Sequence, residues 1–273
     1  MGTLYIVPTP IGNLEDITLR ALRVLREARL IAAEDTRTTR KLLARYDITT
    51  PMTSYHEHNK LAKLDTIFDA LAEGDVALVS DAGTPGISDP GFELIQEALT
   101  RGVPVVPLPG PSAVIAALTG SGLPTDRFLF VGFLPRQPAA LRRALAELAP
   151  LRATLIAYES PNRLVATLDA ARESLGDRPA VVARELTKLH EELRRGTLST
   201  LADHFRAHPP RGEITLVIGG ASEAPPAAPW EERAVRQALQ ERLARGEPRS
   251  AAARAVAEES GWNRRDVYNL SVD

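Results

Sequence analysis

Short apolar runs alternate with longer stretches of helical periodicity along the first 120 residues of the chain. In the longer stretches, apolar residues recur every three or four positions, as Leu19, Leu22 and Leu25 do. Alternation of this kind predicts a mainly parallel sheet that is covered by helices. The strands expected from the apolar runs span residues 4–7, 30–33, 76–80 and 103–107.

Further apolar runs after Gly120 predict a second sheet with its own helices. The expected strands of this sheet span residues 128–133, 154–158, 180–183 and 214–218. The stretch ASEAPPAAP, at residues 221–229, is typical of a semi-rigid linker because proline and small residues dominate it.

The chain beyond Trp230 has no apolar run of the kind expected for a strand. Three short helices fit there: one at 235–243, one that begins after Ser250, and one that opens at Asn263, where Asp266 completes a pattern that resembles a capping box. We therefore predict an α/β fold class, with two α/β domains and a small helical carboxyl-terminal domain. The predicted domains are residues 1–120, 121–222 and 223–273.

Three strands of the first half run directly into loops that are rich in glycine and proline, namely PTPIGN, SDAGTPGISDPG and PLPGPS. The carboxyl ends of parallel strands meet at one edge of a sheet, where α/β proteins bind their ligands. Glycine lets backbone amides approach a ligand closely, and proline stiffens the loop. The sequence therefore predicts an active site at this edge that contacts its ligand largely through the main chain.

Composition excludes several kinds of chemistry. The chain has no cysteine, so thiol nucleophiles, disulfides and thiolate metal sites are excluded. Neither GxxxxGK[ST] nor GxGxxG occurs, which removes the usual triphosphate and dinucleotide signatures. The net charge of −2 gives no overall attraction to nucleic acid or membranes, so nucleic-acid binding needs a local patch. We find no signal-peptide pattern and no run of membrane-spanning length, and we expect a cytoplasmic protein without a membrane partner.

The longest Gly/Pro loop has Asp81 and Asp89 on either side of its glycines. Acidic groups in such a loop suit a ligand that is cationic or bears hydroxyl groups. A simple turn, with Asp89 as the N-cap of the next helix, is the alternative. The presence of three such loops at one sheet edge favours the ligand site.

Six segments, in this order and spacing, resemble the tetrapyrrole methylase superfamily: PTPIGNLEDIT, IAAEDTRTTRKLL, SDAGTPGISDPG, PLPGPSA, YESPNRL and ARELTKLHEE. They are most similar to its branch that methylates the ribose 2′-oxygen of a cytidine in the decoding centre of 16S rRNA. The resemblance covers residues 3–219, and the tail resembles the helical carboxyl-terminal domain of that branch.

The resemblance implies that S-adenosylmethionine binds folded in a cleft between the two α/β domains. The implied first-domain residues near the methionine and sulfonium end are Asp81, Gly83, Thr84, Pro85, Gly86 and Ile87. Ser112, Ala113 and Leu134 would continue this wall. The implied second-domain residues around the adenosine are Tyr158, Glu159, Ser160, Arg184, Glu185, Leu186, Gly212, Glu213 and Ile214.

A ribose hydroxyl is a poor nucleophile until a base shares its proton, so methylation of such a group predicts a nearby base. The candidate catalytic residues are Glu34, Asp35, His56, Glu185 and Lys188. Glu34 and Asp35 follow a strand, where side chains can face the cleft. The alternative for them is a helix-start charge cluster that Arg37 neutralises. The alternative for Lys188 is an ordinary surface ion pair with neighbouring glutamates.

RNA contacts are expected from arginines, because phosphate binding requires local positive charge. The candidate RNA-binding residues are Arg37, Arg40, Arg136, Arg163, Arg264 and Arg265. The three helices of the tail can form a helix-turn-helix variant or serve only as a packing appendage. The pair His56 and His58 has a spacing that metal sites use, but no third ligand is adjacent, and we expect no metal.

We therefore expect a 2′-O-methyltransferase that uses S-adenosylmethionine, acts on 16S rRNA or the small ribosomal subunit and forms a homodimer. One alternative is a methyltransferase for a tetrapyrrole such as a corrin precursor, which would use the same cofactor cleft. Another is a non-catalytic RNA-binding protein of ribosome assembly. The EDTR and RELTK segments and the helical tail argue against the first, and the three Gly/Pro loops argue against the second.

Overall fold

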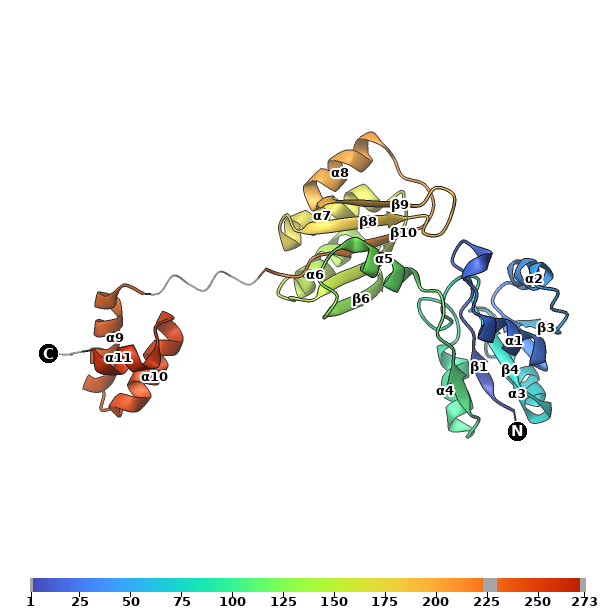
Figure 1. Cartoon of the computed structure of the whole chain (residues 1–273), viewed down its shortest axis with the longest axis horizontal. Coiled ribbons are helices and arrows are strands. Elements are labelled where there is room, and N and C mark those ends of the chain that lie inside the picture. The colour runs from blue at the N-terminus through green and yellow to red at the C-terminus, as the bar shows by residue number, and fades with distance from the viewer. Residues whose placement is uncertain (1, 223–229, 271–273) are drawn as a thin grey trace. The chain divides into compact units, whose positions relative to one another are not determined.

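The computed structural model describes residues 2–222 and 230–270. The chain forms two compact units, Met1–Ala221 and Ser222–Asp273. The larger unit contains two five-stranded sheets (Figure 1). We call residues 2–107, with the first sheet, the first lobe, and residues 113–221, with the second sheet, the second lobe. The predicted α/β fold class is confirmed.

The first sheet is entirely parallel, as its sequence pattern predicts. In spatial order its strands are β3 (Met52–Ser54), β2 (Leu30–Ala33), β4 (Val76–Val79), β1 (Leu4–Ile6) and β5 (Val105–Pro107). All four residues of β4 are buried, which is expected for a parallel strand that is covered on both faces.

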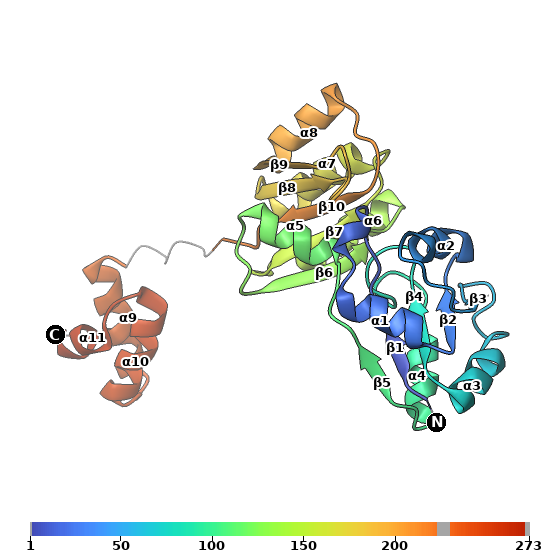
Figure 2. The same cartoon turned by 45° about the vertical axis from the view of Figure 1, so that its right-hand side comes forward.

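Helices cover both faces of the first sheet (Figure 2). These helices are α1 (Leu19–Glu27), α2 (Thr36–Arg45), α3 (Leu64–Glu73) and α4 (Phe92–Thr100). Alternate residues of β4 point to opposite faces: Ala77 and Val79 pack with α1 and α2, and Val76 and Leu78 pack with α3 and α4. A short 3₁₀ helix, η1 (Leu14–Asp16), lies ahead of α1.

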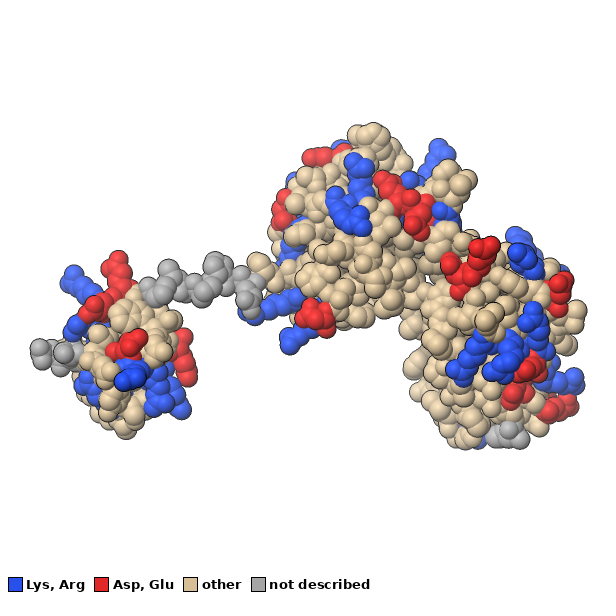
Figure 3. Space-filling view, viewed as in Figure 1, with Lys and Arg blue, Asp and Glu red and all other residues tan. Residues whose placement is uncertain are grey.

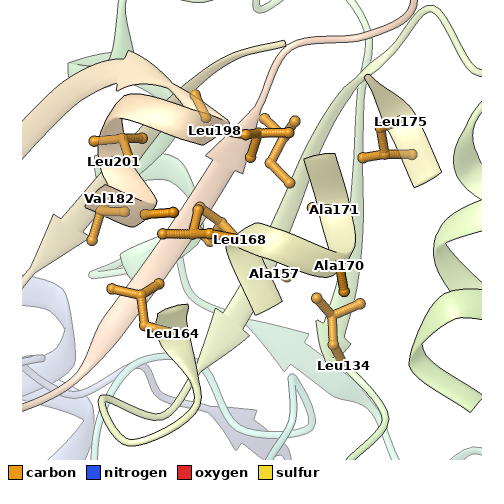
Figure 4. Close-up of a cluster of buried hydrophobic side chains, with 14 of the residues drawn as sticks. Leu134, Ala157, Leu164, Leu168, Ala170, Ala171, Leu175, Val182, Leu198 and Leu201 are labelled. Atoms are coloured by element: carbon orange, nitrogen blue, oxygen red, sulfur yellow. The ribbon is translucent and has the colours of Figure 1, made fainter. Parts of the chain in front are cut away.

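The second sheet is mixed, because only β6 and β7 are parallel and its other pairs are antiparallel. Its strands in spatial order are β6 (Phe128–Phe133), β7 (Thr154–Glu159), β10 (Ile214–Ile218), β8 (Pro179–Arg184) and β9 (Glu192–Thr197). One face carries α6 (Pro138–Leu148), α7 (Leu164–Leu175) and α8 (Leu198–Ala207), with the core drawn in Figure 4.

The other face of the second sheet is covered by α5 (Ala113–Ser121). Val114, Ala117 and Leu118 of this helix pack against strand residues such as Ile156 and Val217. The chain therefore passes from the first sheet to the second at residues 108–112, before α5 begins. The domain boundary expected at residue 120 lies within this helix, near its carboxyl end, and stays a prediction.

The smaller unit contains the three helices predicted for the tail: α9 (Glu232–Ala244), α10 (Arg249–Ser260) and α11 (Arg264–Asn269). Val235, Leu239 and Val256 are fully buried in its core. The side chain of Asn263 caps α11 by accepting from the amide of Arg265 at 2.9 Å. The linker expected at residues 221–229 lies, from residue 223 onward, outside the described residues.

Candidate active site

The three Gly/Pro loops of the first lobe lie against one another at the carboxyl edge of the first sheet. Thr9, after β1, and Gly83, after β4, exchange two backbone hydrogen bonds of 2.9 Å. The hydroxyl of Thr84 donates to the carbonyl of Pro111, after β5, at 3.4 Å. The prediction that these loops meet at one sheet edge is confirmed.

A cavity of about 360 Å³ opens where this edge faces the second lobe. This volume lies within the usual range for small-molecule sites. The lining residues from the Gly/Pro loops and the start of α5 are Ile11, Ala82, Gly83, Thr84, Ile87, Ser88, Asp89, Ser112 and Ala113. The lining residues from the second sheet and its loops are Phe133, Tyr158, Glu159, Ser160, Pro161, Ala183, Leu186, Gly212, Glu213, Ile214 and Thr215.

An aromatic cluster forms part of the second-lobe wall. The ring of Tyr158 lies 4.9 Å from that of Phe130 and 5.4 Å from that of Phe133, measured between centroids. Phe133 is 62% exposed, so its ring is accessible from solvent. Burial raises the pKa of Tyr158, and the nearby charges of Asp89 and Glu213 raise it further. The phenol therefore stays protonated at neutral pH and can donate a hydrogen bond.

The loop after β8 connects the second-lobe wall to the first lobe. The amide of Asn13 donates to Oγ1 of Thr187 at 3.0 Å. A Cβ on Gly12 would lie 2.5 Å from Cγ of Lys188, so only glycine allows this close approach. Glu185 and Thr187 both have positive φ, 51° and 66°, and such strain in non-glycine residues is frequent at functional sites.

Two carboxylates at the carboxyl edge are held by backbone amides. The amide of Asp81 donates to Oε2 of Glu34 at 3.2 Å, and the amide of Asp35 donates to Oδ1 of Asp81 at 3.0 Å. Burial raises the pKa of Glu34, although the hydrogen bond from Asp81 opposes this shift. Loss of hydration likewise raises the pKa of Asp81.

Asp89 lines the cavity itself. Burial raises the pKa of its carboxyl to about 6, and the negative charge of Glu34 adds to the shift. The alternative role as a helix N-cap is wrong, because α4 begins at Phe92 and its N-cap is Gly91. Asp89 therefore combines cavity exposure with a pKa near neutrality, which are the properties expected of a general base.

Three of the five catalytic candidates are engaged in ion pairs. Asp35 caps α2 and pairs with Arg37 at 2.8 Å, and these bonds lower the pKa of Asp35 to about 2. Lys188 lies 2.9 Å from Glu185 and 3.1 Å from Glu213. The hydrogen bond from Lys188 lowers the pKa of Glu185. Burial lowers the pKa of Lys188, but its hydrogen bonds to Glu185 and Glu213 outweigh burial and raise this pKa overall. These shifts make all three groups weak proton acceptors.

His56 and His58 lie beside the carboxyl edge rather than in the cavity lining. Their rings are 6.1 Å apart, and Nδ1 of His56 is buried without a hydrogen-bond partner among the described residues. Within residues 2–222 and 230–270, no three histidine or carboxylate side chains are grouped so that they could hold a metal ion.

The structure places many of the implied cofactor residues around the cavity. Those that line it are Gly83, Thr84, Ile87, Ser112, Ala113, Tyr158, Glu159, Ser160, Leu186, Gly212, Glu213 and Ile214. Those outside the lining are Asp81, Pro85, Gly86, Leu134, Arg184 and Glu185. Leu134 packs in the core of the second lobe, and Arg184 pairs with Glu192 at 2.9 Å. The side chains of these two residues thus have structural partners.

The cavity lining also includes residues outside the implied cofactor set, namely Ile11, Ala82, Ser88, Asp89, Phe133, Pro161, Ala183 and Thr215. Of these, the sequence had indicated Asp89 as an acid that suits a ligand. All of them lie within three residues of an assigned position or, for Ile11, in the PTPIGN loop. Taking each quoted motif in full would have included Ala82, Ser88, Asp89, Pro161 and Ala183. Phe133 and Thr215 are strand residues of β6 and β10 and lie outside the motifs.

The candidate RNA-binding arginines have different environments. Arg37, Arg40, Arg136, Arg264 and Arg265 are exposed. Arg163 donates to the backbone carbonyls of Leu134 and Pro135, at 3.2 and 2.8 Å, and lies 3.3 Å from Glu159. Its guanidinium therefore fixes the loop after β6 and is poorly placed to contact phosphate.

Residues 3–202 match the model of the family "Tetrapyrrole (Corrin/Porphyrin) Methylases". The solved structure of uroporphyrin-III C-methyl transferase from Thermus thermophilus, in complex with S-adenyl homocysteine, is similar with a TM-score of 0.56. It is 23% identical in sequence, over 80% of this chain and 97% of that one, so the likeness concerns the fold. The chain belongs to the tetrapyrrole methylase family.

Two curated relatives match almost the entire chain. One, from Halalkalibacterium halodurans, is 49% identical over 98% of this chain and 94% of its own length. The other, from Synechocystis, is 49% identical over 100% of this chain and 98% of its own length. Both are named ribosomal RNA small subunit methyltransferase I. Within the tetrapyrrole methylases, the chain therefore falls in the group that carries this name, which confirms the resemblance found in the sequence.

Proposed function

We propose that this protein transfers a methyl group from S-adenosylmethionine to the ribose 2′-oxygen of a cytidine in the decoding centre of 16S rRNA. The observation that carries the proposal is the near full-length 49% identity to relatives named for small-subunit rRNA methylation. The cavity at the carboxyl edge, with its Gly/Pro loops, supplies a site of suitable size.

The residues around the cavity fit this cofactor. Ile87, Ala113 and Leu186 offer apolar surface, and the loop at Ala82–Thr84 brings main-chain groups to the wall. The carboxylate of Asp89 suits a neighbouring positive charge, because a buried carboxylate favours a cation. When it is bound, S-adenosylmethionine supplies a methyl group that positive sulfur has activated toward a nucleophile.

We assign the role of general base to Asp89. Its carboxylate lines the cavity and would accept the proton of the attacking ribose hydroxyl. Glu34 lies close enough to raise the pKa of Asp89 and would act as a positioning residue for that charge. Tyr158 would donate a hydrogen bond from its protonated phenol, and Phe133 offers an exposed ring against which a base can stack.

A direct test uses labelled cofactor and small ribosomal subunits from cells that lack the gene. Methyl incorporation into 16S rRNA, mapped to a ribose 2′-oxygen of a decoding-centre cytidine, is the expected result. Transfer to a corrin precursor but not to the subunits would overturn the proposal in favour of the tetrapyrrole alternative. The solved structures of a cobalt precorrin-4 methyltransferase and of a uroporphyrin-III C-methyl transferase are under 25% identical and support this alternative through the shared fold alone.

The alternative of a non-catalytic ribosome-assembly protein has its own test. Calorimetry is expected to detect binding of S-adenosylmethionine, because the loops that line the cavity are intact. Absence of heat, together with unchanged ribose methylation in cells without the gene, would favour the non-catalytic alternative.

We further propose that the protein forms a homodimer, as its resemblance to the superfamily implies, and that it acts in the cytoplasm, as the lack of a signal-peptide pattern in the sequence suggests. No helix of the described residues combines the length and the apolar character that crossing a bilayer requires. Sedimentation of the purified chain tests the dimer, for which a mass of twice 29.6 kDa is expected.

A further inference from the structure

The helices on the two faces of the first sheet carry opposite charge. On one face, α1 has three arginines and one glutamate, and α2 has three arginines and one lysine. On the other face, α3 has three acidic residues and α4 has two, and neither helix contains a lysine or an arginine. Three of these five acids pair with cations outside the two helices: Glu73 with Arg29, Glu93 with Lys60 and Glu97 with Arg101. The excess of charge that is not neutralised in the first lobe is therefore the positive charge of α1 and α2.

The cationic side chains of α1 and α2 form one exposed surface. In α2, the spacings i, i+3, i+4 and i+8 place its four cations on one side of the helix. In α1, the spacing of three residues forms a similar stripe. We call this surface the α1–α2 basic face, and its members are Arg20, Arg23, Arg26, Arg37, Arg40, Lys41 and Arg45. Figure 3 shows lysine and arginine side chains gathered over these helices.

Most of this positive charge is not neutralised within the protein. Arg20, Arg40 and Lys41 have no hydrogen bond or ion pair with any described residue. Arg23 pairs with Glu27, but both side chains are about 60% exposed, and exposed pairs of this kind are weak and easily exchanged. Arg37 pairs with Asp35 and is itself 85% exposed.

The α1–α2 basic face is a single rigid surface. Nη2 of Arg26, on α1, donates to the carbonyl of Tyr46, at the end of α2, at 3.0 Å. Leu22 and Leu25 of α1 pack in the same core as Leu42 and Leu43 of α2. Because the two helices are fixed to each other, their charges keep a constant spacing, which favours a partner with a regular array of negative charges.

The α1–α2 basic face begins at the rim of the cavity. The N-cap of α2 is Asp35, and its amide donates a hydrogen bond to the side chain of Asp81. Ala82, which follows Asp81 in the chain, lines the cavity. The acidic residues that contacts place at the face are Glu27, which pairs with Arg23, and Asp35, which pairs with Arg37. Glu34 and Asp81 lie between the face and the cavity. A polyanion that lies along the basic face can therefore lead directly to the cavity.

We propose that the α1–α2 basic face binds the phosphodiester backbone of the rRNA that flanks the methylated nucleotide. This inference rests on the proposed function. Phosphate contacts carry no sequence information, but they fix the register and orientation of a nucleic acid on a protein. The helices on the opposite face, α3 and α4, contain no lysine or arginine and offer no comparable cationic surface. The difference between the two faces favours RNA on the α1–α2 side of the first sheet.

The test is a triple variant of the full chain, Arg20→Gln, Arg40→Gln and Lys41→Gln, which removes the three charges that have no partner. Its Kd for a transcript of 16S rRNA is measured at several salt concentrations. Each lost phosphate contact lowers the slope of log K against log salt by about 0.7 to 0.9. We expect a slope lower by roughly 2 to 3 and a Kd at least about tenfold higher near 0.1 M salt.

The matched control is Arg142→Gln, Arg143→Gln and Arg172→Gln, which removes the same charge from exposed positions on α6 and α7. We expect its Kd to stay within about twofold of the wild-type value, because those helices lie outside the basic face. Equal salt slopes for the two triple variants would overturn the inference. Methyl transfer by the wild-type chain to small ribosomal subunits is measured separately, so its absence would count against the proposed function instead.

Discussion

The hydroxyl of Thr167 donates a 2.6 Å hydrogen bond to Oε2 of Glu159, and both side chains are buried. The same carboxyl group accepts from the amide of Ser160 at 2.8 Å and lies 3.3 Å from Nη2 of Arg163. One buried acidic side chain therefore connects the end of β7, the loop beside the cavity and the first turns of α7. This network holds the second-lobe wall of the cavity in place.

Removal of the Glu159 side chain is expected to lower the stability of the protein. Glu159→Ala leaves the Arg163 charge and the Thr167 hydroxyl without their partner, which costs about 3 to 5 kcal/mol of unfolding free energy. Glu159→Gln keeps the shape and some hydrogen bonds, so a smaller loss of about 1 to 3 kcal/mol is expected. Urea denaturation measures both values. A loss under about 1 kcal/mol for the alanine variant would contradict the structural role.

The assignment of Asp89 as the base predicts a specific dependence of the rate on pH. The raised pKa, about 6, means that the carboxyl is protonated and unable to accept a proton below that pH. The methylation rate should therefore rise with pH through about 6 and level off above it. Initial rates under subsaturating RNA, measured from about pH 5 to 8, test this expectation.

The variant Asp89→Asn is expected to lower kcat by roughly 10²- to 10⁴-fold and to remove the pH dependence. It should be no less stable than the wild type, because it replaces a charge whose burial is unfavourable with a neutral group. Glu34→Gln is the companion variant. It removes a nearby negative charge, so the midpoint of the pH profile should move to lower pH while most of kcat is retained.

Gly83 and Gly86 have similar backbone conformations, so a comparison of their alanine variants tests whether the main chain at Gly83 contacts the cofactor. Their φ angles are 76° and 82°, so alanine at either position incurs a similar backbone strain of about 1 to 2 kcal/mol. Only Gly83 lines the cavity. Gly83→Ala should weaken binding of S-adenosylmethionine at least about tenfold, and Gly86→Ala should change it little. Calorimetry measures both Kd values, and equal effects would remove Gly83 from the cofactor contacts.

Gly212 allows the chain to pass close to Glu185. A Cβ at Gly212 would lie 2.2 Å from Cδ of Glu185, whereas a Cβ at Gly176, whose φ is nearly the same, would meet nothing within 4 Å. Gly212→Ala should displace the Glu185 carboxylate, and with it the hydrogen bonds from Lys188 and the amide of Glu213. Because Gly212 and Glu213 line the cavity, cofactor affinity should fall.

The control for this change is Gly176→Ala, which bears a comparable φ penalty in open space. Gly176 combines this φ with a ψ of 174°, a region that is essentially restricted to glycine, so the variant should lower the unfolding free energy by about 1 to 3 kcal/mol and leave the cofactor Kd unaltered. The two variants are compared by calorimetry and by thermal unfolding. If both lower cofactor affinity equally, backbone strain rather than the Glu185 contact would explain the loss.

The sequence predicted the apolar strands well. The bounds of β2 and β10 match those expected, and these strands are largely buried. The bounds of β6 match too, although this strand lies at a sheet edge and is partly exposed, because its sequence FLFVGF is apolar throughout. Two strands were missed. The strand β9, with the sequence ELRRGT, lies at a sheet edge and is polar and partly exposed, so it lacks an apolar run. The strand β3 has three residues, at the other sheet's edge, which is too short to show a period.

The candidate site was predicted less completely than the fold. Glycine and proline indicate loops at a sheet edge, so the cavity wall at Gly83 and Thr84 could be predicted from the sequence. The environment of a carboxyl group, which sets its pKa, could not be predicted in this way. Asp89 and Asp35 are both acids near the start of a helix, yet the pKa of Asp89 is raised by burial and that of Asp35 is lowered by Arg37. Only the packed structure distinguishes a proton acceptor from a helix cap.

The unequal charge on the two faces of the first sheet affects the encounter with RNA before any contact forms. A lobe whose excess positive charge lies on one side experiences a torque, as well as an attraction, in the field of a polyanion. At low ionic strength this torque turns the lobe so that α1 and α2 arrive first. A larger fraction of encounters then leads to binding. Because salt screens this orienting field, added salt should lower the association rate constant more than the loss of the phosphate contacts alone predicts.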